Sequence, residues 1–205
     1  MTDLACLENE KLGLLREVFA SATNDASAAM CRWTNSLIRL TLDEVCELPL
    51  EDVCSDLKLG DEPLTMVVLN LEGEAGGAMI LTFTEESARG LAASLLDADV
   101  NPGPEWSELE QSALMETGNI LGCAYVSAIT RLIDYPLMPT TPYFVVDYGA
   151  SVLQQALLGQ VAATDKVLIG RTRFQHNDEE LSWWLLFVPT VALRTVIERA
   201  LHLPS

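Results

Sequence analysis

The stretch LTMVVLNLEGEAGGAMILTF, residues 64–83, decides how this chain folds. Its first part, Leu64–Leu71, is rich in the β-branched and apolar side chains that favour a strand, and so is its last part, Ala78–Phe83. The intervening residues 72–77 include three glycines, which is typical of a tight turn between two strands. We therefore predict an antiparallel β-hairpin at this point.

Segments of different character flank this hairpin. Residues 4–39 place apolar side chains at helical spacing, which predicts a long helix. Residues 41–59 alternate short apolar positions and indicate strands and turns. After the hairpin, Thr84 is a suitable N-cap for a helix that runs to about Asp97. The first hundred residues thus predict a helix, an extended connection, a hairpin and a second helix.

A second series with the same order follows the break at residues 101–104, which contain two prolines and a glycine. It begins with a long helix over residues 105–134, whose start carries a capping box formed by Ser107 and Glu110. The remaining elements expected are an extended segment at 143–147, strands at 166–174 and 181–188, and a terminal helix that Pro189 opens, because proline is favoured in the first turn of a helix.

The two series predict an internal duplication. A shift of 99 residues superposes Glu17 on Glu116, and a shift of 104 residues superposes Leu81 on Leu185. The agreement in the order of elements is stronger support than these few identities. Hairpins joined to helices favour an α+β fold in which long helices pack on an antiparallel β-sheet with pseudo-symmetry. We expect one domain, 1–205, made of two repeats at about 4–100 and about 105–203.

The charge of the chain restricts its partners. Lys and Arg number 12 against 30 Asp and Glu, so the formal net charge is −18. Nucleic acids and anionic membranes require clustered basic residues, and both are therefore excluded as expected partners. A basic partner stays open, as does the plainer interpretation of a well-solvated surface.

The sequence also indicates a compartment and argues against a metal centre. No basic region precedes an apolar run at the N-terminus, and no apolar stretch approaches the roughly 18 residues of a membrane-spanning helix. The five cysteines are odd in number and form no CxxC pair, and there are only two histidines. We expect a cytoplasmic protein without a bound metal.

A polar stripe marks the second long helix as the candidate site. Ser112, Glu116 and Asn119 lie at positions i, i+4 and i+7, within roughly 60° of one another on one helix face. Gly118 and Gly122 lie inside the same helix, where each costs about 1 kcal/mol relative to alanine. We expect the close approach of another backbone to offset that cost. The alternative interpretation of the stripe is a solvated helix face.

The residues 112–119, SALMETGN, resemble the signature of the CheC/CheX/FliY phosphatases of bacterial chemotaxis. That signature has Asp or Ser, three residues, Glu, two residues, Asn, and then 22 residues and Pro. Ser112, Glu116, Asn119 and Pro142 match all four positions. The resemblance covers the full length, because that family is also an internal duplication with one such helix in each half.

The resemblance implies hydrolysis of the aspartyl phosphate on the response regulator CheY. In this family Asn119 would orient the attacking water and Glu116 would pair with the regulator's active-site lysine. Ser112 and Pro142 would support them. The resemblance further implies that Mg²⁺ belongs to the regulator, so that the chain needs no cofactor of its own, and that CheD is a further partner.

The first half departs from the signature. The shift of 99 residues places Gly13, Glu17, Ala20 and Asp43 at the four motif positions, and only Glu17 matches. We therefore expect one working site, in the second half, and treat Glu17 as the remnant of a degenerate first site.

Two alternatives stay open. The same surface could serve a non-catalytic adaptor, a component of the flagellar switch or a CheD-binding module. A regulator of a two-component pathway outside chemotaxis would keep the mechanism and change only the partner.

Overall fold

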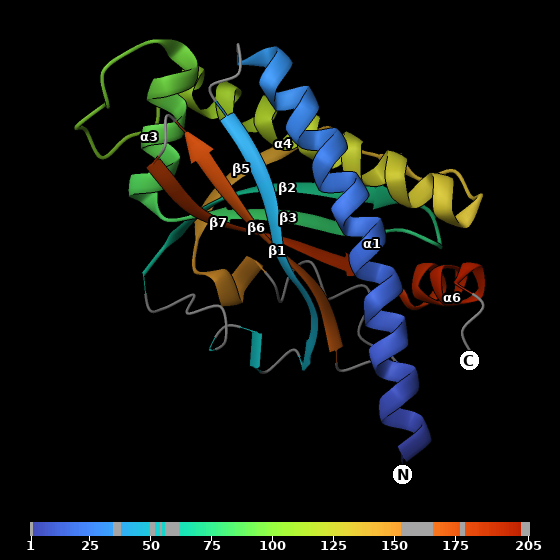
Figure 1. Cartoon of the computed structure of the whole chain (residues 1–205). Coiled ribbons are helices and arrows are strands. Elements are labelled where there is room, and N and C mark those ends of the chain that lie inside the picture. Colours follow the sequence, from blue (N-terminus) through green and yellow to red (C-terminus); the bar gives the residue numbers. More distant parts are fainter. Residues whose placement is uncertain are drawn as a thin grey trace.

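A computed structural model describes residues 2–34, 38–49, 52–53, 55, 62–152, 166–176 and 179–201. Its elements follow one another in the duplicated order that the sequence predicts (Figure 1). The first half contains α1 (Thr2–Trp33), β1 (Ile38–Pro49), β2 (Leu64–Glu72), β3 (Gly77–Phe83) and α3 (Glu85–Leu96). The second half contains α4 (Glu108–Ile133), β4 (Met138–Pro139), β5 (Tyr143–Asp147), β6 (Lys166–His176), β7 (Glu179–Pro189) and α6 (Val191–Ala200).

The strands within the described residues form one antiparallel sheet of seven strands with the order β1-β6-β7-β3-β2-β4, and β5 also pairs with β2. Strand β1 of the first half pairs with β6 of the second half, and β4 and β5 of the second half pair with β2 of the first half. The two halves are therefore interlocked, and neither builds this sheet alone.

The register at the centre of the sheet supports the duplication. Strands β3 and β7 are neighbours, and Leu81 lies directly opposite Leu185. These are the residues that the shift of 104 makes equivalent, and two equivalent residues face one another only at a pseudo-twofold axis. The predicted α+β fold with internal duplication is confirmed, while the repeat boundaries at about 4–100 and about 105–203 stay predictions.

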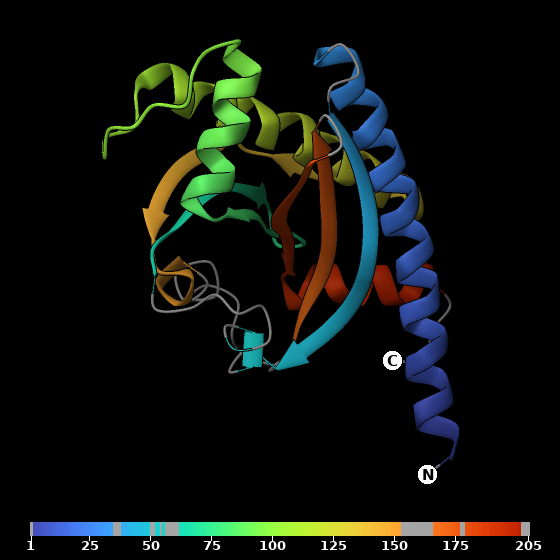
Figure 2. The ribbon, with the colours of Figure 1, turned by 60° about the vertical axis from the view of Figure 1, so that its left-hand side comes forward.

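The helices cover one face of the curved sheet (Figure 2). A large apolar cluster joins side chains of α1, α3, α4 and α6 to alternate residues of the strands, among them Val67, Leu81 and Phe187. A second cluster on the other face contains Met66, Ile80 and other strand residues. Strand β3 is buried along its whole length, because both faces of the sheet are covered there.

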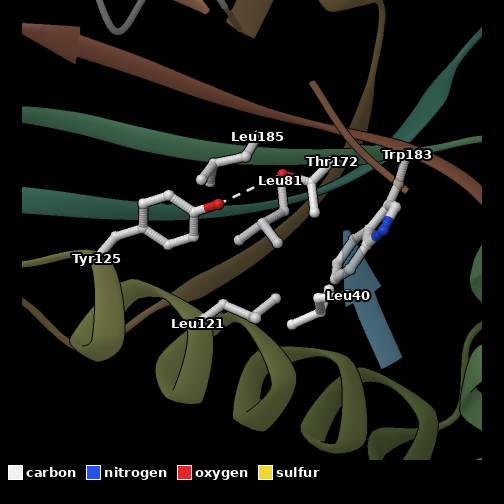
Figure 3. Close-up of a pocket in the computed structure, with 7 residues that line it drawn as sticks. All are labelled: Leu40, Leu81, Leu121, Tyr125, Thr172, Trp183 and Leu185. Atoms are coloured by element: carbon white, nitrogen blue, oxygen red, sulfur yellow. Dashed lines mark hydrogen bonds between the residues drawn. The ribbon is translucent and has the colours of Figure 1, made fainter. Parts of the chain in front are cut away.

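One small cavity lies between α4 and the sheet (Figure 3). Its volume is about 10 Å³, which is close to the minimum that a single water requires. The Tyr125 hydroxyl is hydrogen-bonded to Thr172 at 3.3 Å and to Thr23 of α1 at 2.6 Å, so this buried polar group is satisfied. The cavity is a packing feature rather than a ligand site.

Two predicted boundaries are wrong. The terminal helix α6 begins at Val191 behind the N-cap Thr190, and Pro189 is the last residue of β7, where it pairs with Gly77 of β3. The helix expected over residues 4–39 ends at Trp33, and β1 begins at Ile38. The reason is tertiary, since β1 pairs with β6 from Ile38 to Pro49 and gains backbone hydrogen bonds along that length. Much of the remainder of the predicted 41–59 segment falls outside the described residues. Among the described helices, none has the length and apolar character needed to cross a membrane.

Candidate functional site

The helix that carries the polar stripe has a firmly capped start. The Ser107 hydroxyl accepts a hydrogen bond from the Glu110 N–H at 3.3 Å, and the Glu110 carboxylate accepts one from the Ser107 N–H at 2.9 Å. This is the predicted capping box. Burial by itself would raise the pKa of Glu110, but hydrogen bonds from Ser107 and Asn101 and the charge of Arg89 lower it below the usual value.

This lowered pKa predicts a pH dependence of stability. A carboxyl group whose pKa is lower in the folded state stabilises the fold above its unfolded pKa, near 4.5, and this contribution is lost as the pH falls through the folded value. Glu110→Gln retains a capping side chain without the charge. We expect the variant to be less stable by about 1–2 kcal/mol at pH 7.

Thermal unfolding of both proteins between pH 7 and pH 3 tests this expectation. The difference in stability between the wild type and Glu110→Gln should begin to shrink below about pH 4.5, because Glu110 then takes up a proton on unfolding, and it should be lost as the pH falls through the lower folded pKa. A difference that stays constant across this range would contradict the role assigned to the charge.

The structure places all four predicted residues of the second motif around one groove. Ser112, Glu116 and Asn119 of α4 form one wall, together with Met115, and the opposite wall is the segment 139–142. The groove has a volume of about 420 Å³. Ser112 and Glu116 are exposed, Asn119 is half-buried, and Pro142 is buried. Residues 30 positions apart in sequence thus meet in one place.

The second wall is attached to the sheet. The Thr140 N–H donates to the Asn70 carbonyl at 2.8 Å, and the Asn70 N–H donates to the Thr140 hydroxyl at 3.2 Å. Pro139 pairs with Leu71, and Tyr143 pairs with Val68. Strand β2 therefore holds the wall from both sides of Pro142.

The first wall rests on the same strand. A Cβ atom on Gly118 would overlap Val67 Cγ1 and lie 3.2 Å from Val67 Cβ, and one on Gly122 would lie 2.5 Å from Leu69 Cδ2. The glycines permit close contact, as expected, but the expected partner was wrong: side chains of β2 approach the helix, not another backbone. Since β2 supports both walls, it determines the shape of the groove.

Asn119 has a neighbour that the motif does not include. The Cys123 thiol donates to Asn119 Oδ1 at a sulfur–oxygen distance of 3.6 Å. Burial, and then the negative charge of Glu116, raise the pKa of Cys123. The thiol is therefore protonated at neutral pH and acts as a weak donor to the carboxamide.

Sequence reasoning missed part of this groove. Met115, Thr140 and Thr141 line it beside the motif residues. Met115 is one turn from Ser112 and Asn119, so helical periodicity alone could have indicated it. The threonines carry no such signal, because their place depends on the pairing of β4 and β5 with β2.

The first half lacks the equivalent arrangement. Glu17 is exposed on α1 and does not line the groove, and Ala20 offers no carboxamide. Asp43, at the position equivalent to Pro142, lies at an irregularity in the β1–β6 register. Its backbone carbonyl accepts a hydrogen bond from Arg16 Nη2 at 3.2 Å. Arg16 thus links α1 to β1 at the positions that correspond, by the shift of 99 residues, to the groove of the second half.

Metal ligands do not gather in the described part of the chain. Within residues 2–34, 38–49, 52–53, 55, 62–152, 166–176 and 179–201, no group of three or more His, Cys, Asp or Glu could hold a metal ion. The donors at the groove are one carboxylate, one carboxamide and hydroxyls, and its lining contains no basic residue.

The fold and the groove define a class of protein: a pseudo-symmetric α+β domain in which one helix presents a carboxylate and a carboxamide beside a proline-containing wall. No family model matches the chain. A curated relative, the CheY-P phosphatase CheC of Bacillus subtilis strain 168, is 23% identical over 188 residues, which cover 89% of this chain and 90% of the relative.

Solved structures show the same fold. The crystal structure of Thermotoga maritima FliY has a TM-score of 0.74 at 14% identity, with 95% of this chain and 98% of that chain covered. The FliM middle domain of H. pylori has a TM-score of 0.68 at 14% identity, with 93% and 98% covered. The chain is thus similar in sequence to a CheC protein and in fold to FliY and FliM, in keeping with the resemblance of its motif to the CheC/CheX/FliY family.

Proposed function

We propose that this chain is a phosphatase that hydrolyses the aspartyl phosphate of a CheY-like response regulator in chemotaxis signalling. The observation that carries the proposal is the groove in which Ser112, Glu116, Asn119 and Pro142 meet. The curated relative from Bacillus subtilis is named for this activity, and the match to this chain covers 90% of that relative. The exposed position of Glu116 makes the groove accessible to a folded protein partner.

In the proposed reaction Asn119 orients a water molecule. The water oxygen attacks phosphorus in line with the acyl phosphate bond, and that P–O bond breaks as the new one forms. Inorganic phosphate leaves, the regulator recovers its aspartate carboxylate, and the protons of the water pass to phosphate and solvent. A carboxamide suits this task because it both accepts and donates hydrogen bonds while it stays uncharged beside a phosphoryl group.

Glu116 provides the electrostatic contact with the partner. It is exposed one turn before Asn119 on the same helix face, where it can pair with a lysine of the regulator. Among the described residues, the groove lining contains no Lys, Arg or His, so the groove offers no positive charge to a phosphoryl group. In this proposal the positive charge, including Mg²⁺, comes with the regulator.

The remaining motif residues shape the site. Ser112 adds a hydroxyl on the helix wall one turn before Glu116. Pro142 is buried and has a restricted backbone, so it stiffens the facing wall between β4 and β5. We assign both to support of the groove rather than to the reaction itself.

A phosphate-release assay with purified CheY-like regulators from the same cell tests the proposal. The regulators are phosphorylated, freed of the phosphodonor, and followed with and without a catalytic amount of the chain in Mg²⁺. We expect the chain to accelerate loss of phosphate from at least one regulator. The small acyl phosphate acetyl phosphate should not be hydrolysed, because it brings no lysine and no acidic metal pocket.

The same assay separates the enzyme from its alternative. The likeness to the FliM middle domain favours, as a second candidate, a docking module that uses the same groove. A module of that kind would bind a regulator and leave the lifetime of its phosphate unchanged. Binding to CheD, which the family resemblance implies, stays a prediction for a separate binding measurement.

A further inference from the structure

A buried arginine of the first half reaches the start of the groove-bearing helix. Arg89 of α3 is only 6% exposed. Its Nε donates to Glu85 Oε1 at 2.9 Å, its Nη2 donates to the Pro104 carbonyl at 3.2 Å, and its Nη1 lies 3.5 Å from Glu110 Oε1. A buried guanidinium is costly unless such partners hold it. The mechanism proposed above does not use this group.

Two aromatic rings continue from this arginine to the facing wall. The guanidinium carbon lies 4.3 Å from the centroid of the Trp106 ring, which is a cation–π distance. Trp106 in turn meets Phe144 edge to face, with the centroids 5.3 Å apart and the planes at 61°. Trp106 directly precedes the N-cap of α4, and Phe144 follows Pro142 by two residues. The rings therefore join the ends of the two groove walls.

We propose that Arg89, Trp106 and Phe144 form a clamp that sets the separation of the groove walls, and that Arg89 and Trp106 are positioning residues for the proposed reaction. The inference rests on the proposed function for its kinetic consequences. It gives the first half a task, because α3 belongs to the half whose own motif is incomplete. The half without a working site holds the site of the other half in shape.

The clamp predicts a particular kinetic signature. Arg89→Met retains an unbranched stem over Trp106 but removes every donor of the guanidinium. Glu116 and Asn119 share one rigid helix, so their mutual spacing is retained, whereas their spacing from the 139–142 wall is not. We expect the KM for the phosphorylated regulator to rise about tenfold while kcat changes less than about twofold.

A matched variant separates positioning from general stability. Arg194 of α6 is also largely buried, pairs with Glu47 and Glu198, and does not line the groove. Arg194→Met should lower the melting temperature as Arg89→Met does and leave KM unchanged. Arg89→Lys keeps the charge but lacks the planar fork, so its KM should fall between those of the wild type and Arg89→Met.

A readout without the regulator keeps the clamp testable if the proposed function fails. In ¹H–¹⁵N correlation spectra, the backbone amides of Thr140 and Thr141 should shift in Arg89→Met and stay in place in Arg194→Met. If Arg89→Met does not fold, Trp106→Leu replaces it in the kinetic and the spectroscopic measurements. That variant removes the contacts of the Trp106 ring with Arg89 and with Phe144.

The outcomes are distinct. A wild-type chain that does not release phosphate from any regulator overturns the proposed function, while shifted Thr140 and Thr141 signals would still support the clamp. Unchanged KM together with unchanged Thr140 and Thr141 signals in Arg89→Met overturns the clamp. An equal rise of KM in Arg194→Met overturns it as well, since the effect would then be one of stability.

Discussion

Asn119→Ala should slow the loss of phosphate from the regulator by about 10²–10³-fold, which corresponds to roughly 3–4 kcal/mol of transition-state stabilisation. The side chain is half-buried at the groove, and the variant removes the carboxamide that is proposed to orient water. The helix should be retained, because alanine is the best helix former. Single-turnover phosphate release measures the effect, and circular dichroism reports the fold.

Two variants of the first half are the controls for this prediction. Glu17→Ala removes the one motif residue that the first half retains, and Asn24→Ala removes an exposed carboxamide from α1. Both should leave the rate nearly unchanged. Activity of Asn119→Ala close to that of the wild type would refute the assigned mechanism, and a large loss in Glu17→Ala would show that the first half still has a working site.

Gly118→Ala should destabilise the fold by about 1–3 kcal/mol, although alanine favours helices. The added Cβ would overlap Val67 Cγ1, and the branched side chain of Val67 has little rotamer freedom with which to yield. The expected fall in melting temperature is about 2–4 °C for each kcal/mol. Because Gly118 directly precedes Asn119, the displaced helix should also reduce activity.

The matched control is Gly90→Ala on α3. Nothing lies within 4 Å of a Cβ at Gly90, so this variant should gain about 0.5–1 kcal/mol from helix propensity alone. Val67→Ala should partly rescue Gly118→Ala, and the double variant should be less destabilised than the sum of the two single variants. Additive effects would contradict a direct clash between the two residues.

Local sequence signals predicted most of the fold. The hairpin at residues 64–83 appears as β2 and β3, and Thr84 and Ser107 cap their helices as expected. Such features succeed because strand propensity, turn glycines and capping act within a few residues. The predicted end of the first helix was wrong because β1 is formed by pairing with β6, and these two segments are more than a hundred residues apart in the sequence.

At the site, the spacing of residues predicted which side chains lie on one side of the helix. It did not predict which residues form the opposite wall of the groove. Ser112, Glu116 and Asn119 follow from helical periodicity, and Pro142 came only from the family resemblance. Thr140 was not predicted, since its place depends on the hydrogen bonds it exchanges with Asn70 of β2. The contacts of Arg89 with Trp106 were equally out of reach, because they join the two halves of the chain.

Taken alone, the order of residues established the duplicated pattern of elements and the polar stripe of α4, because periodicity and capping are properties of short segments. The tertiary structure decided that β2 supports both walls of one groove and that the first half braces the site of the second. These features depend on how strands of one half pair with strands of the other half. The residues next to a glycine or an arginine in the sequence carry no information about that pairing.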